Sequence, residues 1–166
     1  KEGVEFEGKT EQLFDQYKLI ILAVFLSKGG SREKAQVLFE NFDINSNNKL
    51  SRTEFNKMWD DSFMVIAKTV YYLTRGHISG LVNPNQLKSY MTNLELGKKL
   101  AFEELTNAVF IGEETEEVPK ELFLNRICTV PVIDLFTTSG FRSYLYQRFL
   151  NFPESDAVPQ SESQRA

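Results

Sequence analysis

Apolar residues recur at three- and four-residue steps along most of this chain, which predicts a protein built mainly of α-helices. The apolar centre of the first helix, Leu19 to Leu26, is far shorter than the roughly 20 residues that a bilayer span requires, so we expect it to lie in a core. The pattern predicts helices over these ranges: 10–28, 31–42, 52–74, 84–91, 119–128 and 139–149.

A polar stretch, Asp43 to Glu54, separates the second and third of these helices and reads DINSNNKLSRTE. Oxygen-bearing side chains stand at its first, third, fifth, ninth and twelfth positions, and the seventh needs only a backbone carbonyl. A helix-loop-helix uses this spacing to surround Ca²⁺ with six to eight oxygens, the last residue binding through both carboxylate oxygens. The sequence predicts an EF-hand with these metal ligands: Asp43, Asn45, Asn47, Lys49, Ser51 and Glu54.

Two departures in this loop predict weak calcium binding. The sixth position, which usually holds Gly because the turn is left-handed, is Asn48, and Asn tolerates that conformation better than most residues. Only Asp43 and Glu54 carry charge among the ligands. Because affinity rises with ligand charge, we expect one site with a dissociation constant on the order of 10⁻⁵ M or poorer. The alternative is a loop of EF-hand shape that stays empty at cellular calcium.

EF-hands normally pair through a short antiparallel β contact at loop position 8, which is Leu50 here. The segment Asn93 to Glu104 places Leu100 at position 8 and Glu104 at position 12, but offers few oxygens elsewhere. We expect it to be a degenerate loop that pairs with the first and binds no ion. The alternative is an ordinary helix that begins at Phe102.

The expected fold is therefore an all-α EF-hand pair with a short β contact between its loops and further helices at the C-terminus. A degenerate helical segment (1–30) precedes the pair (31–112), and a helical extension (113–152) follows it. The acidic run Glu113 to Glu117 is expected to be a solvated loop, and the polar tail 153–166 to be disordered.

The order of these pieces resembles that of a known family. The stretch LSKGGSREKAQVLFENFDINSNNKLSRTEF is similar to the linker and third hand of the neuronal-calcium-sensor type, whose relatives include calcineurin-B-like proteins and ciliary calaxin. The resemblance covers about residues 18–110. It implies a calcium-responsive adaptor whose apolar groove holds a helix of a target protein, with the same six loop residues as ligands. A cytoskeletal or ciliary setting is suggested by this resemblance alone.

Two sets of apolar residues are candidates for binding the partner, an amphipathic helix or a large complex. One set lines the groove that the two helices of the hand would open. The other lies on the last helix, which is apolar nearly all round and therefore favours burial on more than one side. The candidates are Phe39, Phe42, Phe55, Met58 and Trp59 in the groove, and Phe141, Tyr144, Leu145 and Phe149 on the helix.

Composition narrows the function class. The net charge of −4 is typical of acidic calcium-binding proteins and disfavours nucleic acid, which requires a basic patch. One cysteine, Cys128, excludes an internal disulfide framework and suits an intracellular, cytoplasmic or cytoskeletal setting. We expect Cys128 to be a small buried hydrophobe and the single His77 to be an exposed loop residue, so no enzyme is predicted. No membrane insertion is expected.

Three functions remain open on the sequence. The favoured one is a structural or regulatory subunit of a larger assembly, because the loop ligands are mainly neutral and the second loop is degenerate. A calcium switch that opens an apolar groove is the alternative, favoured by the intact Asp43 and Glu54. A regulatory EF-hand segment of a larger enzyme is a lesser alternative.

Overall fold

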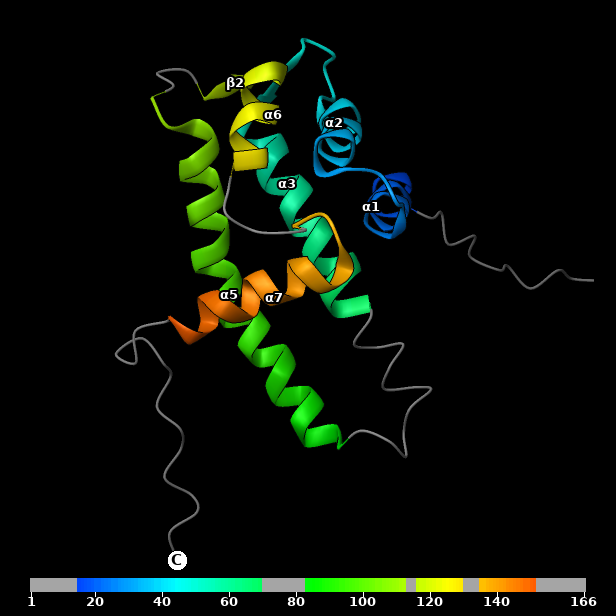
Figure 1. Ribbon diagram of the computed structural model, residues 1–166, viewed down its shortest axis with the longest axis vertical. Coiled ribbons are helices and arrows are strands. Elements are labelled where there is room, and N and C mark those ends of the chain that lie inside the picture. The colour runs from blue at the N-terminus through cyan, green and yellow to red at the C-terminus, as the bar shows by residue number, and fades with distance from the viewer. Residues whose placement is uncertain (1–14, 70–82, 113–115, 130–134, 152–166) are drawn as a thin grey trace, which may run out of the picture.

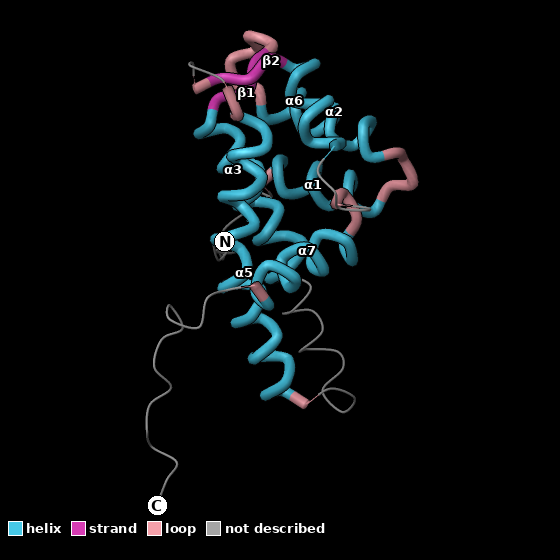
Figure 2. Tube along the Cα trace, turned by 60° about the vertical axis from the view of Figure 1, so that its left-hand side comes forward, coloured by secondary structure: helices cyan, strands magenta, loops and turns pink. Residues whose placement is uncertain are grey.

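The computed structural model describes residues 15–69, 83–112, 116–129 and 135–151 of the chain. Within these residues the protein is mainly helical, as the all-α prediction requires, with one small two-stranded sheet (Figures 1 and 2). The elements in chain order are α1 (Gln16–Leu26), α2 (Ser31–Phe42), β1 (Lys49–Ser51), α3 (Arg52–Ser62), η1 (Phe63–Thr69), α5 (Pro84–Phe110), β2 (Glu117–Pro119), α6 (Lys120–Thr129) and α7 (Thr138–Leu150). The predicted tail, His77 and the end of the predicted helix 52–74 lie outside the described residues.

Helix α1 is buried on one side only. Its N-cap is Asp15, whose carboxylate accepts a hydrogen bond from the Tyr17 N–H and so satisfies one of the free amides of the first turn. Ile21, Val24 and Phe25 are buried, whereas a second apolar stripe faces solvent. That stripe consists of Leu19, Leu22 and Leu26. The apolar centre predicted for a core helix is therefore only partly in the core.

Helix α3 continues without a break into a seven-residue π-helix, η1. Ser51 caps the start of α3, because its hydroxyl accepts from the Glu54 N–H while the Glu54 carboxylate accepts from the Ser51 N–H. In the wider turns of η1 the Thr69 hydroxyl donates to the Met64 carbonyl, five residues earlier. The long helix predicted from Arg52 is thus present, with a change of helical type after Ser62.

The prediction of a second loop at Asn93 to Glu104 is wrong, because both residues lie inside the 27-residue helix α5. The short helix predicted over 84–91 is the first part of this same helix. It begins with Pro84 after the N-cap Asn83, and Pro at the first helical position needs no hydrogen-bond donor. Gly97 does not end the helix, because a single Gly costs only about 1 kcal/mol in a helix interior and packing can offset this.

The partner of β1 is β2, which lies beyond the boundary predicted for the EF-hand pair at residue 112. The strands are antiparallel, with Leu50 opposite Val118 and Ser51 opposite Glu117. Residues 116–119, assigned from the sequence to an extension and its acidic loop, are therefore joined to the first loop by the sheet.

The aromatic core lies where α3 meets the other helices. Phe55 of α3 is fully buried and makes edge contacts with Phe110 of α5 and Phe123 of α6. Helix α7 crosses α5 near its middle, as Figures 1 and 2 both show, and packs against it more extensively than any other pair of elements. The loop between α2 and α3 projects at the end of the molecule that carries the sheet.

Candidate functional site

The Asp43–Glu54 segment connects α2 to α3 through a turn with two left-handed residues. Helix α2 ends at Phe42 and Asp43 is its C-cap residue. Two non-glycine residues in the loop, Ser46 and Asn48, adopt left-handed conformations with φ of 55° and 61°. Asn48 is the residue predicted to take over the left-handed turn from Gly, and this prediction is confirmed.

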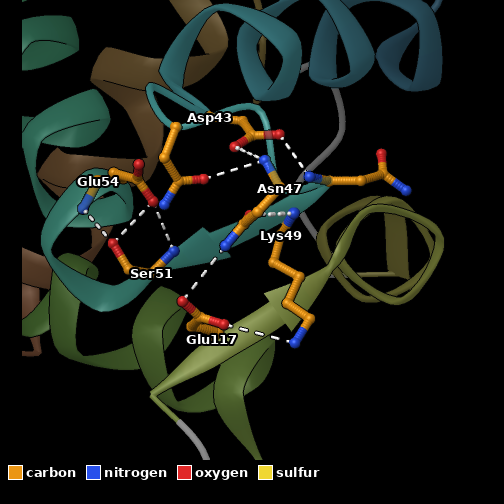
Figure 3. Close-up of polar contacts among 8 residues, drawn as sticks. Asp43, Asn47, Lys49, Ser51, Glu54 and Glu117 are labelled. Carbon is orange, nitrogen blue, oxygen red and sulfur yellow. Dashed lines mark hydrogen bonds and ion pairs between the residues drawn. The ribbon is translucent and has the colours of Figure 1, made fainter.

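The entry half of the loop is organised by side-chain oxygens that accept hydrogen bonds from backbone N–H groups. The Asp43 carboxylate accepts from the N–H of Asn47 at 3.1 Å and from that of Asn48 at 2.8 Å. The Asn45 side-chain oxygen also accepts from the Asn47 N–H, at 3.0 Å. Figure 3 shows the Asp43 carboxylate beside the backbone N–H of Asn47. The oxygens at positions 1 and 3 are thereby held on the same side of the loop.

The exit half is closed by the Glu54 carboxylate. One of its oxygens accepts from the Ile44 N–H at 3.1 Å, which links the two ends of the loop. The other accepts from the N–H and the hydroxyl of Ser51, at 2.9 and 2.7 Å. The residues predicted at positions 9 and 12 are therefore in direct contact. Glu54 is positioned by both ends of the loop at once.

The donor set suits a hard divalent cation. It consists of two carboxylates, two side-chain amides, a hydroxyl and the Lys49 carbonyl, which are the oxygen ligands that Ca²⁺ prefers. An ionised carboxylate has about four acceptor positions. Asp43 uses two of them and Glu54 three, so Asp43 retains two positions for an ion and Glu54 one, on the oxygen that accepts from Ile44; binding through both Glu54 oxygens requires Ser51 to release the other. Across the described residues no three His, Cys, Asp or Glu side chains gather as a metal site, which agrees with a loop that has only two carboxylate ligands.

The segment that faces this loop across the sheet has apolar residues at the two positions that carry charge in the loop. Because Leu50 at position 8 pairs with Val118, the register makes Ile111 the first and Leu122 the twelfth residue of the facing segment. An isoleucine and a leucine provide no side-chain oxygen at the two positions that carry charge in the first loop. The strand that pairs with the first loop thus belongs to residues 117–119, whereas 93–104, where a degenerate partner loop was predicted, is helical.

One residue of the facing strand reaches the first loop and was missed by the sequence analysis. The Glu117 carboxylate lies 3.4 Å from the Asn47 side-chain nitrogen and 3.5 Å from the Lys49 ammonium (Figure 3). Glu117 was assigned to a solvated acidic run, because its contacts depend on a strand register that the sequence does not reveal.

The predicted groove residues are buried in this structure. Phe39, Phe42, Phe55, Met58 and Trp59 are at most 1% exposed, so no open groove is present among them. Trp59 stacks on Phe141 of α7 with ring centroids 5.8 Å apart and an angle of 9°. Phe141, Tyr144 and Leu145 are buried and Phe149 is half-buried. The two sets predicted to bind a partner are thus in contact with each other through Trp59 and Phe141.

Polar contacts also join helix α7 to α5. The Arg148 guanidinium forms an ion pair with Glu104, and the Tyr144 hydroxyl donates to the Ala101 carbonyl at 3.3 Å. The hydrogen bond from Arg148 lowers the pKa of the Glu104 carboxyl, and burial raises the pKa of the Tyr144 phenol. Glu104, predicted as a loop terminus, is instead a helical residue that positions α7.

Cys128 is exposed, so the prediction that it is buried is wrong; it lies one residue beyond the buried Ile127, on the outer side of α6.

Comparison of the chain with protein-family models, curated proteins and solved structures finds no match in any of the three. In the part of the chain that the structure describes, no helix combines the length and hydropathy needed to cross a membrane.

Proposed function

We propose that this chain is an EF-hand protein that binds one Ca²⁺ ion in the loop Asp43–Glu54 and acts as a structural or regulatory subunit bound to a partner protein. The observation that carries the proposal is the ordered loop itself. Its side-chain oxygens at positions 1, 3, 9 and 12 are held by hydrogen bonds within the loop, and Asn48 makes the left-handed turn. This arrangement prepares the oxygens for an ion.

Residues 111–122 are proposed as the second hand of the pair. The antiparallel contact between Leu50 and Val118 supports this, since it joins two helix-loop-helix units at equivalent positions. Helices α5 and α6 flank the second loop as α2 and α3 flank the first. The second hand has an architectural role in this proposal, and its loop binds no ion.

A permanent subunit is favoured over a calcium switch by the magnitudes involved. A site with a dissociation constant near 10⁻⁵ M, at a tenfold higher calcium concentration, stabilises the bound form by about 1.4 kcal/mol. Removing the Phe141 ring from the Trp59 stack would cost about 3–5 kcal/mol, the usual effect of deleting a buried aromatic side chain. Calcium alone is therefore insufficient to displace α7.

One observation favours the calcium switch. The Trp59 indole N–H is buried and, among the described residues, has no hydrogen-bond acceptor. An unsatisfied buried donor costs about 1–3 kcal/mol, and this cost would be relieved if α7 were replaced by a partner that supplies an acceptor. A calcium switch would thus require the partner to contribute to opening.

Calorimetric titration with Ca²⁺, followed in parallel by Trp59 fluorescence, tests the proposal. The wild-type chain should bind one ion, and Glu54→Gln should bind at least tenfold more weakly, because one carboxylate oxygen and one charge are removed. Glu103→Gln, an exposed residue of α5 with no contact to the loop, makes the same charge change and should bind like wild type.

The same titration separates the two functions. Ion binding with little change in Trp59 emission supports the permanent subunit, because Trp59 stays stacked on Phe141. A large emission change that saturates with calcium and is lost in Glu54→Gln would support the switch. Equal affinity in wild type and Glu54→Gln, or no binding at millimolar calcium, would refute calcium binding at this loop.

A further inference from the structure

The Asn47 side chain has two polar ends that are not interchangeable. Its oxygen accepts a hydrogen bond from the Lys49 N–H at 2.8 Å, within the loop. Its nitrogen points out of the loop and lies 3.4 Å from a carboxylate oxygen of Glu117 (Figure 3). Asn47 stands at position 5, where the side-chain oxygen serves as a ligand.

The orientation of the Asn47 side-chain amide is set by contacts at both its oxygen and its nitrogen. A flipped amide would place its oxygen against the Glu117 carboxylate and its NH₂ group against the Lys49 N–H, so two attractive contacts would become two repulsive ones. Glu117 thus favours the one orientation that leaves the Asn47 oxygen on the ion side. Asn47 is exposed, and the contacts of its amide group in the described structure are these two alone.

Strand register explains why Glu117 can reach the loop. Glu117 lies directly opposite Ser51, and Lys49 is the diagonal neighbour on the same face of the two-stranded sheet. The Lys49 ammonium lies 3.5 Å from the second carboxylate oxygen of Glu117. Both carboxylate oxygens of Glu117 therefore contact residues that contribute ligands to the loop.

The ion pair itself contributes little. The side chains of Lys49 and Glu117 are 48% and 36% exposed, and solvent screens such pairs so strongly that each changes an equilibrium constant only a few-fold. Glu117 also neutralises the exposed charge of Lys49, and by the same argument this changes calcium affinity only about twofold to threefold. The geometric effect on Asn47 is the larger one, because residues that orient metal ligands typically change affinity 10–100-fold when they are removed.

We infer that Glu117, from the hand that binds no ion, is a positioning residue for the calcium site of the other hand: it orients the Asn47 amide so that its oxygen faces the ion. This inference rests on the calcium function proposed for the loop. It assigns the silent hand a role beyond support, since its strand supplies a polar group that completes the ligand arrangement of the first loop.

Variants at neighbouring residues of the same strand region test the inference by calorimetric Ca²⁺ titration. Glu117→Val removes the acceptor and should weaken binding about tenfold. Glu117→Gln keeps an oxygen that can accept from Asn47, and should lose no more than about threefold. Glu116→Val is the matched control, because it removes the same charge from an exposed neighbouring side chain. It should also lose no more than about threefold.

Asn47→Asp provides the decisive comparison, because a carboxylate has two equivalent oxygens and needs no orientation. In that background Glu117→Val should cost no more than Glu116→Val does. An equal tenfold cost in the wild-type and Asn47→Asp backgrounds would overturn the inference, since it would reflect charge or strand stability alone. A Glu117→Gln loss as large as that of Glu117→Val would overturn it too.

A measurement without calcium keeps this inference separable from the calcium function. In the metal-free protein, the NMR signals of the Asn47 side-chain NH₂ group should shift in Glu117→Val and stay in place in Glu116→Val. Failure of wild type to bind Ca²⁺ would overturn the calcium function, and the positioning role with it. Wild-type binding together with unmoved Asn47 signals would overturn the positioning role alone.

Discussion

Gly97→Ala should destabilise the protein, although the same change stabilises most helices. A Cβ atom built on Gly97 would fall within contact distance of the Leu145 carbonyl oxygen and lie 2.9 Å from the Phe149 nitrogen, both on the backbone of α7. Backbone atoms cannot rotate away as a side chain would. Helix α7 must therefore shift by about 1.5 Å to restore ordinary contacts of roughly 3.5 Å.

Opposing effects set the size of this change. Ala gains about 1 kcal/mol over Gly in helix propensity. Overpacking typically costs about 1–3 kcal/mol, and a shift of α7 would also weaken the Tyr144 hydrogen bond to Ala101, worth about 1 kcal/mol. The net expectation is a loss of about 1–3 kcal/mol in the free energy of unfolding.

Urea denaturation followed by Trp59 fluorescence measures this loss, and the emission of the folded state reports the stack on Phe141. Asn107→Ala, at an exposed position of the same helix, should instead raise stability by up to about 0.7 kcal/mol, because Ala is the better helix former. A Gly97→Ala protein as stable as wild type, with unchanged Trp59 emission, would refute the close crossing of α5 and α7.

Two further predictions concern the loop and the α5–α7 ion pair. Asn48→Gly should raise the stability of the metal-free protein by up to about 1 kcal/mol, and Asn48→Ala should lower it by about 1 kcal/mol, because φ is 61° at this residue. Urea denaturation measures both changes. Equal changes in the two variants would contradict the left-handed turn. Glu104→Gln should cost up to about 1 kcal/mol at pH 7, a figure limited by the 40% exposure of the Glu104 side chain. Because the Arg148 hydrogen bond lowers the folded-state pKa of Glu104, its contribution is present above the ordinary glutamate pKa and is lost as pH falls through the lowered value. The stability difference between wild type and Glu104→Gln should therefore be constant from pH 7 to about 5 and close at more acidic pH, and a gap that widened in acid would contradict the pair.

The first loop could be predicted because its signal is local. All its residues lie within twelve positions of one another, so side-chain type and spacing are enough to locate the left-handed turn at Asn48. The cap that Ser51 forms on α3 and its contact with Glu54 were not predicted. Helix periodicity likewise located α2, α6 and α7 to within about three residues of their observed ends.

The pairing of β1 with β2 could not be predicted because the information that defines it is not local. The sequence analysis placed Gly97 inside a degenerate loop, yet this Gly is needed where α7 crosses α5. A sequence pattern cannot distinguish a Gly that permits a turn from one that permits close helix packing. The pairing of Val118 with Leu50 depends on a contact between residues 68 positions apart, and the facing loop retains no ligand at its two ends to mark it.

The burial of Trp59 and Phe141 could not be predicted for a similar reason, and it bears directly on function. Their apolar character was predicted, but an apolar residue favours burial against the chain's own helices and against a partner equally. The covering helix decides between these outcomes, and here α7 is held by Arg148, Tyr144 and the close approach at Gly97 together. Under the proposed calcium function, a weak site would supply only about 1.4 kcal/mol, which is less than these contacts together contribute. The loop is thus better suited to reinforcing the end of the molecule that carries the sheet than to opening the opposite face of α3, and a partner that acts on α7 is the component required for any larger change.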